Sequence, residues 1–197
     1  MRNNSSAGIY LLAIAVMVAV ASLTITELFT RDARTRAEQE KIIQNLNAVA
    51  PLASYDNNPS LEAQRHRHNG KSYIVYPFIK DSRAAGYVIQ NETQAAYNGL
   101  LRLLVGVRND RTCSGVRVIQ HRETPGLGDR IEADRSTWIL TLNDLPIDRT
   151  AWQLQKDGGT VANLTGATIS ARATLNTAYE ALLYFAQDLE YSNSPDK

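Results

Sequence analysis

Thr165-Gly166-Ala167-Thr168 places two hydroxyl side chains directly before a long amphipathic segment. The N-terminus of a helix carries unpaired backbone N–H groups and the positive end of the helix dipole, and both favour a phosphate. Gly166 permits close backbone approach or a positive φ, and Ala167 adds little bulk. Thr168 can act as N-cap or present its hydroxyl outward. Thr168 is therefore a candidate phosphate-bearing residue, although threonines that only cap a structural helix are more common.

Two further segments each contain two glycines. Pro125-Gly126-Leu127-Gly128 predicts a tight turn of low bulk, through which backbone amides can approach a planar ring or a phosphate. A plain hairpin connection would use the same residues, and Glu123 beside Arg122 could equally form a surface ion pair. The second segment is Lys156-Asp157-Gly158-Gly159, shortly before the threonines. Neither segment identifies a cofactor by itself.

The order of the motifs is more specific than any one of them. Between about Gly99 and Phe185 the chain carries Leu103-Leu104-Val105-Gly106, then Glu-Thr-Pro-Gly-Leu-Gly-Asp from Glu123, then Lys-Asp-Gly-Gly and Thr-Gly-Ala-Thr. In these motifs and their order the chain resembles the G subunit of the Rnf electron-transport complex. That family is related to the C subunit of the sodium-pumping NADH:quinone reductase.

The resemblance implies an FMN joined to Thr168 by a phosphoester bond. It also implies a flavin pocket formed by the last three of these motifs, namely Glu123, Thr124, Pro125, Gly126, Leu127, Gly128, Lys156, Asp157, Gly158, Thr165, Gly166 and Ala167. Relatives tend to carry Gly-Tyr-Ser-Gly-Ala-Ile where this chain has Ala96-Tyr97-Asn98-Gly99-Leu100-Leu101, and Leu164 replaces a frequent aromatic residue.

The implied function is electron carriage. By resemblance, the chain is one component of an ion-translocating oxidoreductase whose other subunits hold flavins and iron–sulfur centres. Such a complex couples electron transfer between NADH and ferredoxin or flavodoxin to Na⁺ or H⁺ movement. A separate magnesium-dependent flavin transferase would attach the flavin, because unactivated threonine is a poor nucleophile. No catalytic side chain is assigned to this chain. The alternatives are a membrane-anchored assembly or binding module without a redox flavin, and a single-pass flavoprotein sensor or regulator outside an ion pump.

Composition argues against several other kinds of protein and site. The chain has 197 residues and a formal net charge of +1, which offers no electrostatic footprint for nucleic acid. Its single cysteine, Cys113, excludes an internal disulfide and an iron–sulfur centre built from this chain alone, and we expect it to be a small buried or half-buried residue. Arg65-His66-Arg67-His68 is interpreted as a solvated surface, so no metal site is assigned.

Residues 7–26 contain no charge and are rich in Ile, Leu, Val and Ala. A helix of about 20 such residues spans roughly 30 Å, the apolar thickness of a bilayer. The segment predicts one transmembrane helix in the cell inner membrane, in contact with lipid. The alternative is a cleavable signal peptide, whose apolar core is usually about 7–15 residues long. Arg31, Arg34 and Arg36 outnumber Arg2 and would place the large domain in the cytoplasm, whereas the resemblance implies the periplasmic side.

The elements that position the motifs follow from periodicity. Residues 31–50 predict a helical stalk ended by Pro51, and 55–69 a loop. Strands are expected at 73–78, 85–90, 101–107 and 115–120, with a hairpin turn at 109–110. Residues 137–142 form a strand or a short helix, and Trp138 and Trp152 are expected in the core, with flavin contact as the alternative. A last helix from Ile169 would bury Leu175, Ala178, Leu182, Phe185 and Leu189.

The predicted fold class is α+β: an N-terminal transmembrane helix followed by a twisted, mainly antiparallel sheet packed with helices. We expect four parts: 1–30 as tail and membrane helix, 31–70 as stalk and loop, 71–190 as an extracytoplasmic FMN-binding domain, and 191–197 as a C-terminal tail.

Overall fold

The computed structural model describes residues 4–189, without the side chains of 4–9, 23, 25–26, 28–39, 188 and 189. The expected tail at 191–197 lies outside these residues. The chain divides into two compact units, Met1–Ile42 and Ile43–Lys197. Residues 43–70, expected as the end of a stalk and a loop, thus belong to the second unit.

The first unit consists of most of helix α1, which runs without a break over Asn4–Ala48. The expected membrane and stalk segments are therefore consecutive parts of one helix. Its described apolar side chains are exposed, for example Leu11, Leu12 and Val18. Among the described residues, no helix is both long enough and apolar enough to cross a bilayer.

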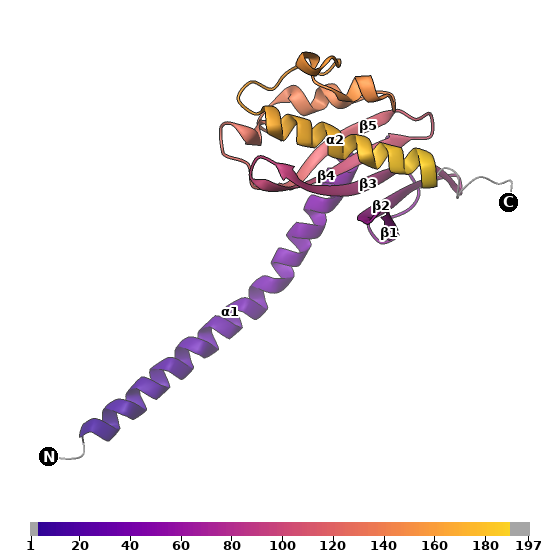
Figure 1. Cartoon of the computed structure of the whole chain (residues 1–197). Helices are drawn as coiled ribbons and strands as arrows, with labels where there is room; N and C mark the ends of the chain where they lie inside the picture. Colours follow the sequence, from indigo (N-terminus) through magenta and orange to yellow (C-terminus); the bar gives the residue numbers. More distant parts are fainter. Residues whose placement is uncertain (1–3, 190–197) are drawn as a thin grey trace. The chain divides into compact units, whose positions relative to one another are not determined.

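The second unit is built on a five-stranded antiparallel sheet in the order β1-β2-β3-β4-β5, so that each strand pairs with its neighbours in sequence (Figure 1). The strands are β1 Gln64–His68, β2 Lys71–Lys80, β3 Arg83–Ala96, β4 Gly99–Arg108 and β5 Cys113–His121. All four predicted strands are confirmed, with longer bounds. The Asn109-Asp110 turn is confirmed between β4 and β5.

Strand β1 corrects the prediction of a loop at 55–69. It pairs with β2 from Gln64 opposite Val75 to His68 opposite Lys71. Asn69 and Gly70 connect the two strands with φ values of 48° and 77°. Two positive φ values are the signature of a type I′ hairpin turn, and Asn-Gly is its preferred sequence. That dipeptide was the signal that could have predicted the hairpin.

Helix α2, Thr168–Tyr184, lies across one face of the sheet and packs on β3 and β4 (Figure 1). A π-helical turn follows at Phe185–Leu189. The predicted apolar stripe of the last helix is confirmed at its four described positions, because Leu175, Ala178, Leu182 and Phe185 are all at most 2% exposed.

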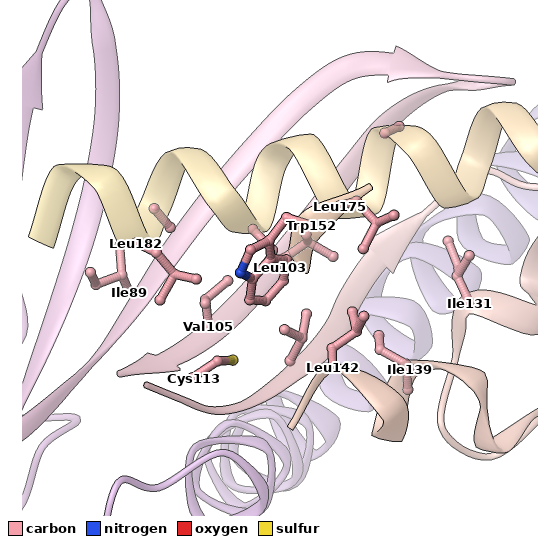
Figure 2. Close-up of a cluster of buried hydrophobic side chains, with 14 of the residues drawn as sticks. Ile89, Leu103, Val105, Cys113, Ile131, Ile139, Leu142, Trp152, Leu175 and Leu182 are labelled. Atoms are coloured by element: carbon pink, nitrogen blue, oxygen red, sulfur yellow. The ribbon is translucent and has the colours of Figure 1, made fainter. Parts of the chain in front are cut away.

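The main core lies between α2, the sheet and a series of short 3₁₀ helices. These are η1 Gly128–Ile131, η2 Thr137–Leu142, η3 Arg149–Trp152 and η4 Gln155–Asp157. The expected strand or short helix at 137–142 is therefore the short helix. Figure 2 shows Trp152 beneath α2 among Leu103, Val105 and Leu175. Trp138 and Trp152 are buried, and their ring N–H groups donate to the carbonyls of Ala162 and Pro146. The predicted core placement of both tryptophans is confirmed.

Cys113 lies in the same core and is fully buried, as predicted. Loss of solvation on burial raises the pKa of its thiol to about 12. The thiolate is the reactive form of cysteine, so this thiol is chemically inert in the folded protein.

A smaller cluster covers the opposite face of the sheet, where Leu46 and Val49 contact Phe78, Val88 and Leu104. Ser114 Oγ donates to the Val49 carbonyl at 2.6 Å. A Cβ added to Gly106 would lie 1.9 Å from that same carbonyl oxygen. The glycine of the Leu-Leu-Val-Gly motif thus allows the chain after α1 to lie directly against β4.

Candidate flavin site

A cavity of about 410 Å³ opens where the start of α2, the loop after β5 and the β3–β4 turn meet. It is lined by Tyr97, Glu123, Thr124, Leu127, Gly128, Gly166, Ala167, Thr168, Ile169 and Ser170. Pockets that bind cofactors typically have volumes of about 300–1,000 Å³ and largely apolar walls with a few placed polar groups. The residues present fit a planar cofactor that carries a phosphate.

The start of α2 forms the end of this cavity that suits a phosphate. Gly166 has φ +82°, so the expected positive φ is confirmed, and the chain turns there into the helix. The N-cap is Ala167, and no side chain caps this end. The alternative in which Thr168 is the N-cap is therefore wrong. The uncapped first-turn N–H groups remain suited to an anion.

Thr168 presents its hydroxyl outward, toward a lysine. Lys156 Nζ donates to Thr168 Oγ1 at 2.6 Å. Arg130, from η1, donates to the Thr165 carbonyl at 3.2 Å, so a second cation lies beside the motif. No acidic residue occupies the first turn of α2. The electrostatics of this helix end therefore favour a negatively charged group at Thr168.

Glu123 forms the polar wall of the cavity and is only 5% exposed. Its Oε1 accepts the Asn98 backbone N–H at 3.0 Å, and its Oε2 accepts the hydroxyl of buried Ser170. Glu123 is thus held between the β3–β4 turn and α2. The alternative of a surface ion pair between Glu123 and Arg122 is wrong.

The loop after Glu123 is closed on itself. The Thr124 carbonyl accepts the backbone N–H groups of Leu127, Gly128 and Asp129 at 3.1–3.4 Å. The loop leads into η1 and not into a returning strand, so the hairpin alternative is wrong. A Cβ on Gly128 would lie 2.4 Å from Glu123 Oε2, so only glycine leaves room for the carboxylate.

His121 holds the two ends of this loop together. Its Nδ1 accepts the Glu123 backbone N–H at 2.9 Å, and its Nε2 lies 2.5 Å from Glu132 Oε1, just beyond η1. Because Nδ1 accepts a hydrogen bond, the ring proton must be on Nε2, where it is donated to Glu132. The imidazole therefore fixes the loop from behind the cavity.

The structure separates the expected pocket residues into groups. Seven of them line the cavity: Glu123, Thr124, Leu127, Gly128, Gly166, Ala167 and Thr168. Lys156 reaches the site through Thr168, while Asp157 binds Arg172 instead. Pro125, Gly126, Gly158 and Thr165 are not among the lining residues.

Sequence reasoning missed five residues that the structure brings to the site. Three of them, Tyr97, Ile169 and Ser170, line the cavity, and Tyr97 and Ile169 are 67% and 49% exposed. The other two are Arg130 and Arg172. Helical spacing from Thr168 would have placed Ile169, Ser170 and Arg172 near the site. Tyr97 stands where relatives also tend to carry Tyr, which was a signal for it, but nothing local indicated Arg130.

All the residues that line this cavity lie in a part of the chain that matches a known domain family. Residues 96–183 match the FMN-binding domain family. The G subunit of the ion-translocating oxidoreductase complex of Pseudomonas aeruginosa is 33% identical over 198 residues, covering 95% of this chain and 91% of that protein. Its counterpart in Vibrio cholerae is 32% identical over 185 residues, covering 90% and 88%.

The crystal structure of Shewanella oneidensis NqrC has a TM-score of 0.43 and 18% identity, covering 65% of this chain and 75% of that chain. That similarity is too low to support a conclusion, whereas the relatives from P. aeruginosa and V. cholerae match over nearly their whole length. The chain belongs to the family of the G subunit of the ion-translocating oxidoreductase complex.

Proposed function

We propose that this chain is the electron-carrying subunit of a membrane-bound, ion-translocating oxidoreductase, and that it holds FMN by a phosphoester bond to Thr168. The observation that carries the proposal is the position of Thr168 Oγ1. It lies at an uncapped helix N-terminus, in the wall of a cavity of cofactor size and 2.6 Å from a lysine ammonium. When bound, FMN supplies one-electron and two-electron redox chemistry.

The chain's own residues bind and orient the cofactor. Lys156 and the first turn of α2 neutralise the phosphate charge. Leu127, Ile169 and Tyr97 offer exposed apolar surface to the ring, and Glu123 sets the charge beside it. None of the described residues is assigned as an acid, a base or a nucleophile for a turnover reaction. The chain acts as an electron relay within a translocase.

Residues 1–30 anchor the chain in the inner membrane in this proposal, with the FMN-binding domain on the periplasmic side. The support is the uncharged stretch 7–26 and the exposure of apolar side chains such as Leu11 and Leu12 along α1. A reporter enzyme active only in the periplasm, fused after residue 190, tests the orientation. Activity of a cytoplasmic reporter at that position would contradict it.

The partners in this proposal are the flavin-bearing and iron–sulfur subunits of the complex, and a flavin transferase that loads Thr168. The relatives from V. cholerae and P. aeruginosa are components of an ion-translocating oxidoreductase complex. Co-purification of the tagged protein with multi-span redox subunits is the expected result. Isolation as a lone flavoprotein would favour a sensor or regulator instead.

The attachment is tested by denaturing electrophoresis under ultraviolet light. The expected result is a fluorescent band, with an intact mass that exceeds the polypeptide by one FMN less one water. Thr168→Ala should abolish both signals, whereas the matched variant Thr165→Ala should retain them. Fluorescence that survives in Thr168→Ala, or wild-type protein of unmodified mass, would contradict the proposal.

A further inference from the structure

We propose that Asp157 and Arg172 form a clamp that holds Lys156 against the Thr168 hydroxyl, and that Lys156 prepares this oxygen to accept the flavin phosphate. The inference rests on the proposed attachment at Thr168. It concerns how the acceptor is positioned before the reaction, and it gives Asp157 and Arg172 a role outside the cavity.

The contact between Lys156 and Thr168 has a defined direction. An ammonium can only donate, so Thr168 Oγ1 is the acceptor in the 2.6 Å hydrogen bond. The hydroxyl proton therefore remains free to leave toward another group. Lys156 lies in η4 and its side chain is exposed. A long exposed lysine samples many rotamers, and the fraction of them that reaches Thr168 depends on where its backbone lies.

The clamp supplies that restraint. Arg172 Nε donates to Asp157 Oδ2 at 2.7 Å, and Arg172 Nη2 donates to Asp157 Oδ1 at 2.6 Å. Two parallel bonds between a guanidinium and a carboxylate fix orientation as well as distance. Arg172 follows Thr168 by four residues, so both lie on one face of α2. The ion pair therefore ties the turn that carries Lys156 to the helix turn that carries the acceptor.

The turn is also fixed from its other side. Gly158 ends η4 with φ +89°. A Cβ on Gly159 would lie 2.2 Å from the Gln153 carbonyl oxygen, so the chain packs there without space for a side chain. This contact and the Asp157–Arg172 pair restrain the backbone on the C-terminal side of Lys156. The motion left to Lys156 is therefore mainly rotation about its own side-chain bonds.

The reaction is a phosphoryl transfer from a flavin dinucleotide, which the transferase binds with Mg²⁺. Thr168 Oγ1 bonds to the phosphorus on the FMN side, the bond from that phosphorus to the oxygen bridging the two phosphates breaks, and AMP leaves. The hydroxyl proton passes to a base of the transferase. Lys156 stabilises the negative charge that grows on Oγ1 and afterwards lies beside the phosphodiester. Asp157 and Arg172 act as positioning residues.

The experiment measures attachment kinetics on the purified full chain with transferase, FAD and Mg²⁺, by in-gel fluorescence and intact mass. Lys156→Met should lower kcat on the order of tenfold with KM for the chain unchanged. Asp157→Asn and Arg172→Gln should lower kcat severalfold, and Arg172→Lys should fall between Arg172→Gln and wild type. The double variant Asp157→Asn/Arg172→Gln should be no slower than the slower single variant, because both remove one interaction.

Glu180→Gln is the matched control. Glu180 also lies on α2 in an exposed ion pair, with Lys71 at 2.5 Å, but not at the cavity. It should react as fast as wild type. Exposed ion pairs add little stability, so Tm should stay within about 2 °C in every variant. A Tm loss that matches the loss of rate would indicate a structural role and overturn the proposal.

Two other results would also overturn it. One is Lys156→Met with an unchanged kcat or with only a raised KM, since that would make Lys156 a docking contact for the transferase. The other is a double variant as slow as the product of both single effects. Failure of the wild-type chain to accept flavin at all would instead contradict the proposed function, so the two failures are distinguishable.

Discussion

Ser170→Ala should destabilise the protein by about 2 kcal/mol. Ser170 is 1% exposed, and its hydroxyl donates to Glu123 Oε2, whose residue is 5% exposed. Without it, one oxygen of a buried carboxylate loses its donor, and Asn98 N–H remains on the other. A hydrogen bond to a charged group contributes about 1.5–3 kcal/mol, and alanine recovers about 0.5 kcal/mol of helix propensity.

Thr174→Val is the matched control, because it removes a buried hydroxyl one turn further along α2. Thr174 Oγ1 donates at 2.8 Å to the Ser170 carbonyl, a neutral acceptor. Its loss should cost about 0.5–1 kcal/mol. Urea unfolding of the full chain, followed by the fluorescence of buried Trp138 and Trp152, measures both free energies. The Tm of Ser170→Ala should fall by roughly 4–8 °C.

The reasoning is refuted if Ser170→Ala costs no more than Thr174→Val. A double-mutant cycle with Glu123→Gln makes the test sharper. If the hydroxyl acts through the carboxylate, the double variant should cost less than the two single variants added together. Strict additivity would mean that Ser170 contributes by packing alone.

Three further predictions follow from local geometry and charge. Gly128→Ala should cost about 1–3 kcal/mol in urea unfolding, because its Cβ would lie 2.4 Å from Glu123 Oε2; a stability equal to wild type would show that the loop simply shifts. Cys113, with its pKa raised to about 12 by burial, should resist iodoacetamide at pH 8 until urea unfolds the chain, and rapid labelling of native protein would be inconsistent with a closed core. The hydrogen bonds from Arg172 lower the pKa of Asp157 below its ordinary value of 3.8. The contribution of the Asp157–Arg172 ion pair to the free energy of unfolding is therefore complete above pH 3.8. It is lost as the pH falls through the lower pKa that Asp157 has in the folded state. A carboxyl ¹³C titration should give a midpoint below 3.8 that rises in Arg172→Gln, and an equal midpoint in both proteins would contradict the assignment.

Much of the fold could be predicted because its signals are local. Enrichment in Val, Ile and Tyr between turn-forming residues located four strands, and the spacing of Leu175, Ala178 and Leu182 located α2. The strand at Gln64–His68 was missed because its charged residues suggested a solvated loop. Pairing with β2 and packing of His66 and His68 near the Tyr184 ring make it a strand.

The site was partly predictable for the same reason. Motif residues such as Glu123 and Thr168 were identified, but the roles of Asp157 and Gly158 were not resolved by their place in a motif. Asp157 belongs to an ion pair beside the cavity, and Gly158 ends a turn. Such distinctions depend on the direction of a side chain, which neighbours from other elements decide.

The sequence by itself determined the position of the Thr-Gly-Ala-Thr motif, the helix that follows it and the apolar faces that must be buried, since these depend on residue type and short-range spacing. Only the tertiary structure decided that Tyr97, Glu123 and Thr168 share one cavity, and that Lys156 contacts the Thr168 hydroxyl. The physical reason is that these contacts join segments far apart in the chain. Their geometry is set by how α2 and the loops pack on the sheet, and no local pattern records that packing.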